Sequence, residues 1–536
     1  MNINKIIALS LSLMVFLTAC ENVEATSEFP SYDNGYDRSQ TIMQPASNAG
    51  HGAPVYLDKQ SNLPSGVTQP TTFMSEINDV FWPLGWDALN SWETELTEVQ
   101  KLLVVPVSFK DTRKKATEDI RQDISKTFFG KASDTGWESV ASYYYKSSRG
   151  QLTLTGEVTP WINLGTATTE LRNSSQIEDL VIKKIYDTLP GEMLQEYDLN
   201  QDGWLDALWI VYAADIQQNN NETFWAFVSW VNAESNMDKP YPGVFGWTSY
   251  EFMYEGGNAG LPQFKGDEGK LLVDSHTFVH ETGHMLGLTD YYDYDQEANP
   301  SGGVDMMGNN IIDHNAYSKF LLHWNQPLIP NAIQEETTIR LRPAAQSGDF
   351  ILLNPEWNGS VFDEYILLEY YTVEGLNEKD SRVRYQTDYS IAVGHNQPGV
   401  RVWHVDSTLW AGPIRNNWFT YDYEVTPQPG DVYADVKDVN THAVYFGASN
   451  TTSEGRDEDF DLLKLLDASG AGSYYNSYRA NSSNSSLFQP GDEISDWNKY
   501  LKNDTGKFNS GNDIGFTVSF GAMDANGIQV TLTKTI

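Results

Sequence analysis

The segment His280–Asp290, which reads HETGHMLGLTD, constrains the fold of this chain more than any other feature. His280 and His284 are four residues apart, so on an α-helix they project from one face and can hold one metal ion. Gly287 predicts a left-handed turn at the end of that helix, which brings Asp290 back towards the same ion. The sequence therefore requires a helix, a sharp turn and a returning loop.

The residue between the histidines adds chemistry to this geometry. Glu281 can reach the open side of the metal and take a proton from an activated water molecule. Three protein ligands (His280, His284 and Asp290) with one open position are typical of a catalytic zinc rather than a structural one. His276, one turn earlier on the same face, is predicted to be a packed or supporting residue. The alternatives are two histidines on an ordinary surface helix and a degenerate motif that has lost activity.

Charge and length limit the kind of protein. The chain has 536 residues, with 35 Lys and Arg against 73 Asp and Glu, so its formal net charge is −38. Such an acidic chain is not expected to bind nucleic acid. Aromatic residues make up 13% of the sequence, which indicates a folded chain, and the length predicts two or three domains.

The single cysteine, Cys20, lies in an informative place. It excludes an intrachain disulfide and a cysteine-based zinc site. Residues 1–19 have the charge and short apolar run of a signal peptide. Leu17-Thr-Ala-Cys20 further resembles the lipobox of bacterial lipoproteins. This resemblance predicts an exported protein of the cell envelope that an N-terminal lipid anchors to the membrane. Release of the protein outside the cell is an additional possibility. The alternative is an ordinary signal peptide followed by an unmodified cysteine.

The rest of the chain divides by composition and periodicity. Residues 20–95 are polar and are predicted to form a tether or leader. Residues 96–330 should form a catalytic domain with a mixed sheet, and residues 331–536 a β-rich, sandwich-like domain, so the predicted class is α+β. Strands are expected at 102–109, 151–158, 207–213, 338–341, 365–371, 399–404, 514–520 and 528–534, and helices at 116–129, 137–148 and 177–189. Pro106 indicates an edge strand or a bulge, and residues 473–486 an exposed loop.

A second motif predicts a calcium site. In Asp198-Leu-Asn-Gln-Asp-Gly-Trp-Leu-Asp206, oxygen side chains stand at Asp198, Asn200, Asp202 and Asp206, with Gly203 at the sharp turn. This spacing copies the first part of an EF-hand loop but lacks its final bidentate glutamate. The alternative is a solvated acidic turn. Beyond the zinc motif, Asp293 and Asp295 are expected to orient the turn or to bind a cation.

Several stretches together resemble the immune inhibitor A family of secreted bacterial zinc metallopeptidases. They are HExxHxxGxxD, the methionine turn Val304-Asp-Met-Met-Gly308, Thr135–Tyr144 with Ser148-Arg-Gly-Gln-Leu152, His314–Trp324, and the β-rich segments 364–369 and 399–406. The resemblance covers residues 100 to 410 and is weaker beyond them. One departure is Leu288-Thr-Asp290, where the family usually has Leu-Pro-Asp.

The resemblance implies a zincin, metzincin-like fold with Met307, or alternatively Met306, beneath the metal, and a leader that acts as an inhibitory pro-segment. The expected function is hydrolysis of peptide bonds in extracellular proteins. Tyr317, His314 and His323 are candidates for stabilising the transition state, none of them preferred. Two other functions remain open: a surface-binding lipoprotein with a vestigial peptidase domain, and a carbohydrate-active lipoprotein suggested only by the many Trp and Tyr residues.

Overall fold

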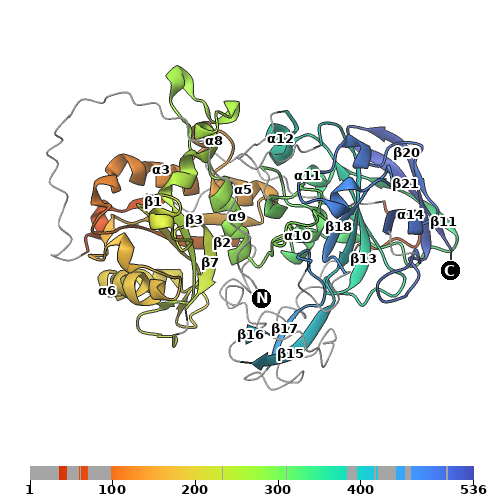
Figure 1. The fold of residues 1–536 in the computed structure, drawn as a ribbon. Helices are drawn as coiled ribbons and strands as arrows, with labels where there is room; N and C mark the ends of the chain where they lie inside the picture. The colour runs from red at the N-terminus through yellow and green to blue at the C-terminus, as the bar shows by residue number, and fades with distance from the viewer. Residues whose placement is uncertain are drawn as a thin grey trace. The chain divides into compact units, whose positions relative to one another are not determined.

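The computed structural model describes residues 36–44, 60, 62–69, 98–231, 233–308, 311–382, 395–415, 418–419, 442–452, 460–501 and 505–535. Residues 36–536 belong to one compact unit, whose sheets and helices are drawn in Figure 1. Separate sheets combined with helices confirm the α+β class. The predicted signal peptide and Cys20 lie outside the described residues. Within the described part, no helix combines the length and apolar character needed to cross a membrane.

A seven-stranded sheet is built from the first half of the chain, in the order β1-β3-β2-β6-β9-β7 with β4 beside β2. Strands β3, β2, β6 and β9 run parallel, whereas β1 and β7 are antiparallel to their neighbours at the two edges. Their bounds are β1 (Ile42–Gln44), β2 (Glu98–Ser108), β3 (Leu152–Val158), β4 (Ile162–Asn163), β6 (Leu208–Tyr212), β7 (Phe227–Trp230) and β9 (Val244–Ser249). The strands predicted at 102–109, 151–158 and 207–213 are confirmed.

Helices cover both faces of this sheet, as Figure 1 shows. On one face, η5 (Glu178–Ile182) and α6 (Lys183–Thr188) share a core with Leu208 and Ile210 of β6. The other face carries α3 (Glu118–Phe129), α5 (Val140–Ser147) and α9 (His276–Met285). Trp209 points to that face because side chains alternate along a strand. Its ring lies 5.2 Å from Phe128 of α3 and 5.7 Å from Phe278 of α9, which fixes α9 on the sheet.

The edge position suggested by Pro106 is wrong. Strand β2 is interior and pairs with β6 along Leu103–Val107. On its other side, pairing with β3 ends at Val104 and pairing with β4 begins at Val107. Pro106 therefore falls in the gap between two partners, where a missing N–H removes no ladder hydrogen bond.

Two further sheets are built from the second half of the chain. A five-stranded sheet has the order β10 (Pro327–Leu328), β12 (Phe350–Leu353), β13 (Glu364–Tyr371), β14 (Gly399–Asp406) and β18 (Leu463–Leu466). A four-stranded sheet has the order β11 (Glu336–Leu341), β21 (Gly527–Lys534), β20 (Phe516–Asp524) and β19 (Glu493–Ile494). Alternate apolar side chains of both sheets meet in one core, including Leu368, Val402, Phe520 and Val530.

Shorter elements complete the described chain. Strand β5 (Trp204–Leu205) pairs with β8 (Tyr241–Pro242), and β15 (Leu409–Arg415) pairs with β16 (Trp418–Phe419) and β17 (His442–Phe446). The remaining helices are α4 (Ala132–Thr135), α7 (Gly191–Leu194), α8 (Glu255–Asn258), α10 (Ala316–Leu321), α11 (Ala344–Ser347), α12 (Glu378–Arg382) and α14 (Asn498–Leu501).

Residues 473–486 are not simply an exposed loop. Tyr474 and Ser482 are buried, because this segment packs against the loop that follows the zinc motif. Asn299 donates its backbone N–H to the Tyr474 carbonyl, and Ser482 donates its own to the Gly302 carbonyl.

The described part of the predicted leader is folded into the body. Ile42–Gln44 adds β1 to the edge of the first sheet by pairing with β3. Val67 lies in the core between the two later sheets, and Thr68 bridges to Ile329. These leader residues therefore contribute to both parts of the fold.

Candidate metal centre

Helix α9 carries the two histidines and ends where the sequence predicts. Gly287 has φ +99°, and its N–H donates to the His284 carbonyl at 2.9 Å. The Leu288 N–H donates to the Gly283 carbonyl at 2.9 Å. These two bonds form a Schellman motif, which needs a left-handed residue that glycine adopts without strain. The chain then turns back and carries Asp290 to the face of α9 that presents the histidines.

Three predicted ligand atoms converge at this point. Asp290 Oδ1 lies 2.9 Å from His280 Nε2 and 3.5 Å from His284 Nε2, and the three side chains are 6%, 7% and 18% exposed, respectively. Among the described residues, they form the one group of three His, Cys, Asp or Glu side chains whose ligand atoms all lie within 4.8 Å. Two imidazole nitrogens and one carboxylate oxygen suit zinc.

Backbone carbonyls fix the orientation of both imidazole rings. His280 Nδ1 lies 3.0 Å from the Met306 carbonyl oxygen, and His284 Nδ1 lies 2.8 Å from the Leu288 carbonyl oxygen. A carbonyl only accepts, so in a neutral ring Nδ1 carries the proton and Nε2 keeps its lone pair. Both lone pairs therefore face Asp290, as a bound metal requires.

The charges at the centre favour a cation between these groups. Burial lowers the pKa of His284, but the neighbouring Asp290 carboxylate raises it by more, to about 9. Burial raises the pKa of Asp290, but the imidazoles bring it well below its usual range. Burial also raises the pKa of Glu281. A proton on histidine fills the cationic role without metal, and zinc would displace it.

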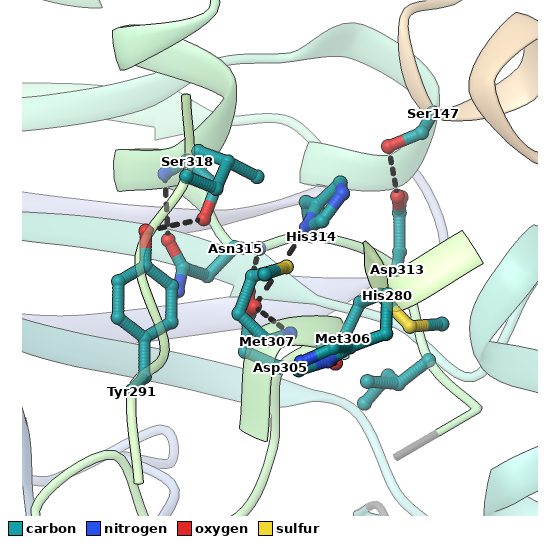
Figure 2. A network of polar contacts seen from close by, with 12 residues as sticks. Ser147, His280, Tyr291, Asp305, Met306, Met307, Asp313, His314, Asn315 and Ser318 are labelled. Atoms are coloured by element: carbon teal, nitrogen blue, oxygen red, sulfur yellow. Dashed lines mark hydrogen bonds and ion pairs between the residues drawn. The ribbon is translucent and has the colours of Figure 1, made fainter. Parts of the chain in front are cut away.

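The methionine turn lies beneath α9 and uses both methionines. A Cβ atom on Gly283 would lie 2.6 Å from Met307 Sδ, so Met307 packs directly against the glycine between the two ligands. Met306 contributes the backbone carbonyl that is hydrogen-bonded to His280 Nδ1. Figure 2 shows this turn with His280, Asp305 and His314 around it.

Asp305 fastens the methionine turn to α10. Its Oδ1 accepts the Met307 N–H at 2.8 Å, and its Oδ2 accepts the Asn315 N–H at 2.6 Å. The Asn315 side chain in turn caps α10 by accepting the Ser318 N–H at 3.0 Å. Figure 2 shows Tyr291 reaching the same cap, with its hydroxyl 2.9 Å from Ser318 Oγ. The loop that carries the third ligand is thus tied to α10 as well.

The three candidates for transition-state stabilisation have structural contacts, and His314 is one of the residues around the methionine turn. His314 packs at 5.4 Å edge to face on the Tyr143 ring. Tyr317 is fully buried against Tyr291. His323 is half-buried, and its desolvation lowers its pKa to about 4. Among the contacts of the described residues, none joins these three to a predicted zinc ligand.

Two tyrosines that sequence reasoning overlooked do adjoin the ligands. The Tyr294 hydroxyl donates to Asp290 Oδ2, and its residue is 55% exposed. The Tyr292 ring stacks at 6.4 Å on the His280 ring. The Tyr-Tyr-Asp-Tyr run immediately after Asp290 was the available signal.

His276 and Asp293, which were predicted to support the site, are both buried. His276 is buried in the first turn of α9, and burial lowers its pKa to about 3, so its ring is neutral. Asp293 is fully buried and accepts the backbone N–H groups of Asp295, Glu297 and Ala298. Asp293 therefore orients the turn, which was one of its two predicted roles.

The acidic loop at Asp198–Asp206 uses its carboxylates differently. Asp198 accepts the N–H groups of Asp202 and Gly203, each at 3.0 Å, and Asp206 Oδ2 accepts the Leu199 N–H at 2.9 Å. Asn200 donates to Asp202 Oδ2 at 3.1 Å. Within the described residues, these carboxylates do not form a group like that at His280. The calcium site stays a prediction.

Comparison with known proteins does not identify a function for this chain, so a functional assignment has to rest on the geometry of the site. No family model matches this chain, and no curated protein is significantly similar to it.

Proposed function

We propose that this chain is an exported, lipid-anchored zinc endopeptidase with a zincin, metzincin-like catalytic region. The convergence of His280 Nε2, His284 Nε2 and Asp290 Oδ1 carries the proposal. Glu281 follows the first ligand on the same helix and is 7% exposed, so it stands at a dry site beside the metal position. The resemblance to immune inhibitor A peptidases supports the same activity.

The residues divide the chemistry between them. A bound zinc ion supplies a Lewis acid that polarises the scissile carbonyl and makes water a nucleophile at neutral pH. His280, His284 and Asp290 hold that ion. Glu281 accepts the proton of the attacking water and then donates it to the leaving amine. The raised pKa of Glu281 suits both halves of this transfer, because it lies closer to neutrality than that of an exposed glutamate.

Tyr294 is our candidate donor to the developing oxyanion. A peptide hydrolase benefits from a hydrogen-bond donor aimed at that oxygen. The Tyr294 hydroxyl donates to Asp290 Oδ2 beside the predicted metal position, and it would turn from that carboxylate to the oxyanion. The side chain is exposed enough for a substrate to reach it. Tyr317, His314 and His323 lack this placement.

The edge of the first sheet supports an extended polypeptide as substrate. Strand β7 is the last strand in the described order of that sheet, and it contacts α9. Phe227, Val228 and Ser229 line an open cleft of about 870 Å³ together with the loops at 168–174 and 219–223. An exposed strand edge can pair with the backbone of an extended peptide irrespective of most of its side chains.

The test is cleavage of casein by the purified full-length protein, with and without a zinc chelator. Glu281→Gln should retain zinc and lose at least about a hundredfold in activity, because the ligands remain and the base is removed. Glu297→Gln, at an exposed position in the neighbouring loop, is the matched control and should be fully active.

Two results would contradict this proposal. Chelator-resistant cleavage would exclude a metallopeptidase. Activity of Glu281→Gln above roughly a few per cent of wild type would exclude Glu281 as the base. A wild-type protein that binds zinc but cleaves nothing would favour the alternative of a surface-binding lipoprotein.

The lipid anchor is tested separately. Cys20→Ser should release the protein from the membrane fraction and abolish metabolic labelling with a fatty acid. Equal labelling of mutant and wild type would leave an ordinary signal peptide as the explanation.

A further inference from the structure

The loop that carries the third ligand is held by a distant part of the chain. Three consecutive residues between β17 and β18, Asn450, Thr451 and Thr452, each contact it, and we call them the 450–452 clamp. The contacts join residues 157 to 159 positions apart in sequence. They come from the β-rich part of the chain, whereas His280 and His284 lie on α9, which packs on the first sheet.

Each clamp residue uses a different hydrogen bond. Asn450 Nδ2 donates to the Tyr291 carbonyl at 3.0 Å, immediately after Asp290. Thr451 Oγ1 accepts the Tyr294 N–H at 3.3 Å. Thr452 gives two bonds to Asp293, from its N–H at 3.1 Å and from its hydroxyl at 2.7 Å. The clamp thus grips three of the four residues that follow the ligand.

The clamp is itself rigidly attached. Asn450 and Leu463 exchange two hydrogen bonds of 2.9 Å, one in each direction, and Leu463 begins strand β18. Strand β18 pairs with β14 inside the five-stranded sheet. The position of the clamp is therefore set by a sheet, and not by another loop.

Asp293 transmits this attachment to the ligand loop. Its carboxylate is fully buried, and it gathers three N–H groups of the loop as well as both Thr452 donors. Moving a buried carboxylate with these partners costs free energy, because each lost N–H or O–H donor leaves a carboxylate oxygen without its hydrogen bond. The turn between Asp290 and Ala298 therefore starts from the left-handed Gly287 that follows α9, and the clamp holds its first residues, Tyr291 to Tyr294.

We propose that Thr452 is a positioning residue for the metal centre, which acts through Asp293 to hold Asp290 against the two histidines. This inference rests on the proposed function, since it takes zinc as the bound ion. Helix α9 sets the spacing of its own two ligands, whereas Asp290 lies on the loop beyond Gly287, which the methionine turn and the clamp hold from the side. The β-rich half of the chain is thereby part of the catalytic site.

The test measures zinc affinity directly, by competition with a chromophoric chelator and zinc alone, on the full chain. Thr452→Val keeps the shape of the side chain and removes its hydroxyl, and it should weaken zinc binding about tenfold, as loss of a group that orients a ligand typically does. Thr452→Ser restores the hydroxyl and should bind zinc within about twofold of wild type.

A matched control and a second readout separate positioning from general stability. Thr531→Val removes a hydroxyl from the exposed Thr338–Thr531 pair of the four-stranded sheet and should leave zinc affinity unchanged. The visible spectrum of the cobalt-substituted protein reports ligand geometry, and it should change in Thr452→Val alone. If that variant fails to fold, Thr451→Val removes the acceptor of the Tyr294 N–H and tests the same clamp.

The outcomes distinguish the two proposals. Wild-type zinc affinity and an unchanged cobalt spectrum in Thr452→Val would overturn the clamp and leave the peptidase proposal intact. A wild-type protein that binds no zinc would overturn both. Equal weakening in Thr452→Val and Thr531→Val would show a general loss of stability and would overturn the positioning role.

Discussion

Two segments of this chain, His280–Asp290 and Asp198–Asp206, resemble metal sites in sequence. They differ in the hydrogen-bond partners of their polar side-chain atoms. In the first, the Nδ1 atoms of His280 and His284 are hydrogen-bonded to backbone carbonyls, and their Nε2 atoms face Asp290 Oδ1. In the second, carboxylate oxygens accept N–H groups of their own loop.

The difference teaches that charge density alone does not define a metal site. A site for a transition metal needs donor atoms whose lone pairs converge, held there by hydrogen bonds to their other atoms. The His280–Asp290 motif has this arrangement already. At Asp198–Asp206 a cation would have to compete with backbone N–H groups or share the oxygens with them, so that loop should bind more weakly and affect stability more than chemistry.

A matched pair of substitutions gives the largest expected contrast. Asp290→Ala should weaken zinc binding about a hundredfold, because structural sites with four protein ligands bind zinc with roughly 10–16 kcal/mol, or about 3 kcal/mol for each ligand. Asp206→Ala should leave zinc affinity unchanged. Chelator competition on both variants measures the contrast, and comparable losses in the two would erase the distinction between the loops.

Per pH unit, the pH dependence of zinc binding should be the next largest effect. In the metal-free protein His284 has its pKa raised from 6.5 to about 9, so its stabilising pair with Asp290 is fully present below pH 6.5 and is lost as the pH rises through 9. Zinc must displace this proton, so its affinity should rise about tenfold per pH unit across that window. The thermal midpoints of zinc-loaded and zinc-free protein should therefore diverge from pH 6.5 to 9. A constant gap would show that no proton is released.

Calcium should have the smallest effect. Millimolar calcium, with zinc held constant, should raise the thermal midpoint by a few degrees, because an ion that binds only the folded state at about a hundred times its Kd contributes about 2.7 kcal/mol. Asp198→Ala combined with Asp202→Ala should remove the shift, and magnesium serves as the control cation. If wild type shows no shift, the loop is a solvated acidic turn.

The parts of the site that depend on local spacing could be predicted from the sequence. His280, Glu281 and His284 share one helix, and Gly287 adopts the left-handed turn that its position after the helix suggested. Buried parallel strands such as β2 and β6 were also recognisable as apolar runs, and only the neighbours of Pro106 were misjudged.

The parts that depend on tertiary contacts could not be predicted. Nothing near Asn450 or Thr452 in the sequence indicates that they face Asp293, since a hydrogen bond between residues 159 apart leaves no local pattern. The burial of Tyr474 in a Ser- and Asn-rich segment has the same origin, because the partner is the loop at Asn299. Tyr294 was overlooked for a different reason: its role depends on where Asp290 lies.

The 450–452 clamp also determines when, during translation, the proposed metal centre can be completed. His280 and His284 are synthesised 172 and 168 residues before Thr452 completes the clamp (452 − 280 and 452 − 284), which at about 5–20 residues per second is roughly 10–30 s. Throughout that interval the loop that carries Asp290 lacks its contacts with Asn450, Thr451 and Thr452, so the proposed metal centre is unfinished in the nascent chain. Chain order alone thus delays completion of the proposed metal centre until residue 452 has been made.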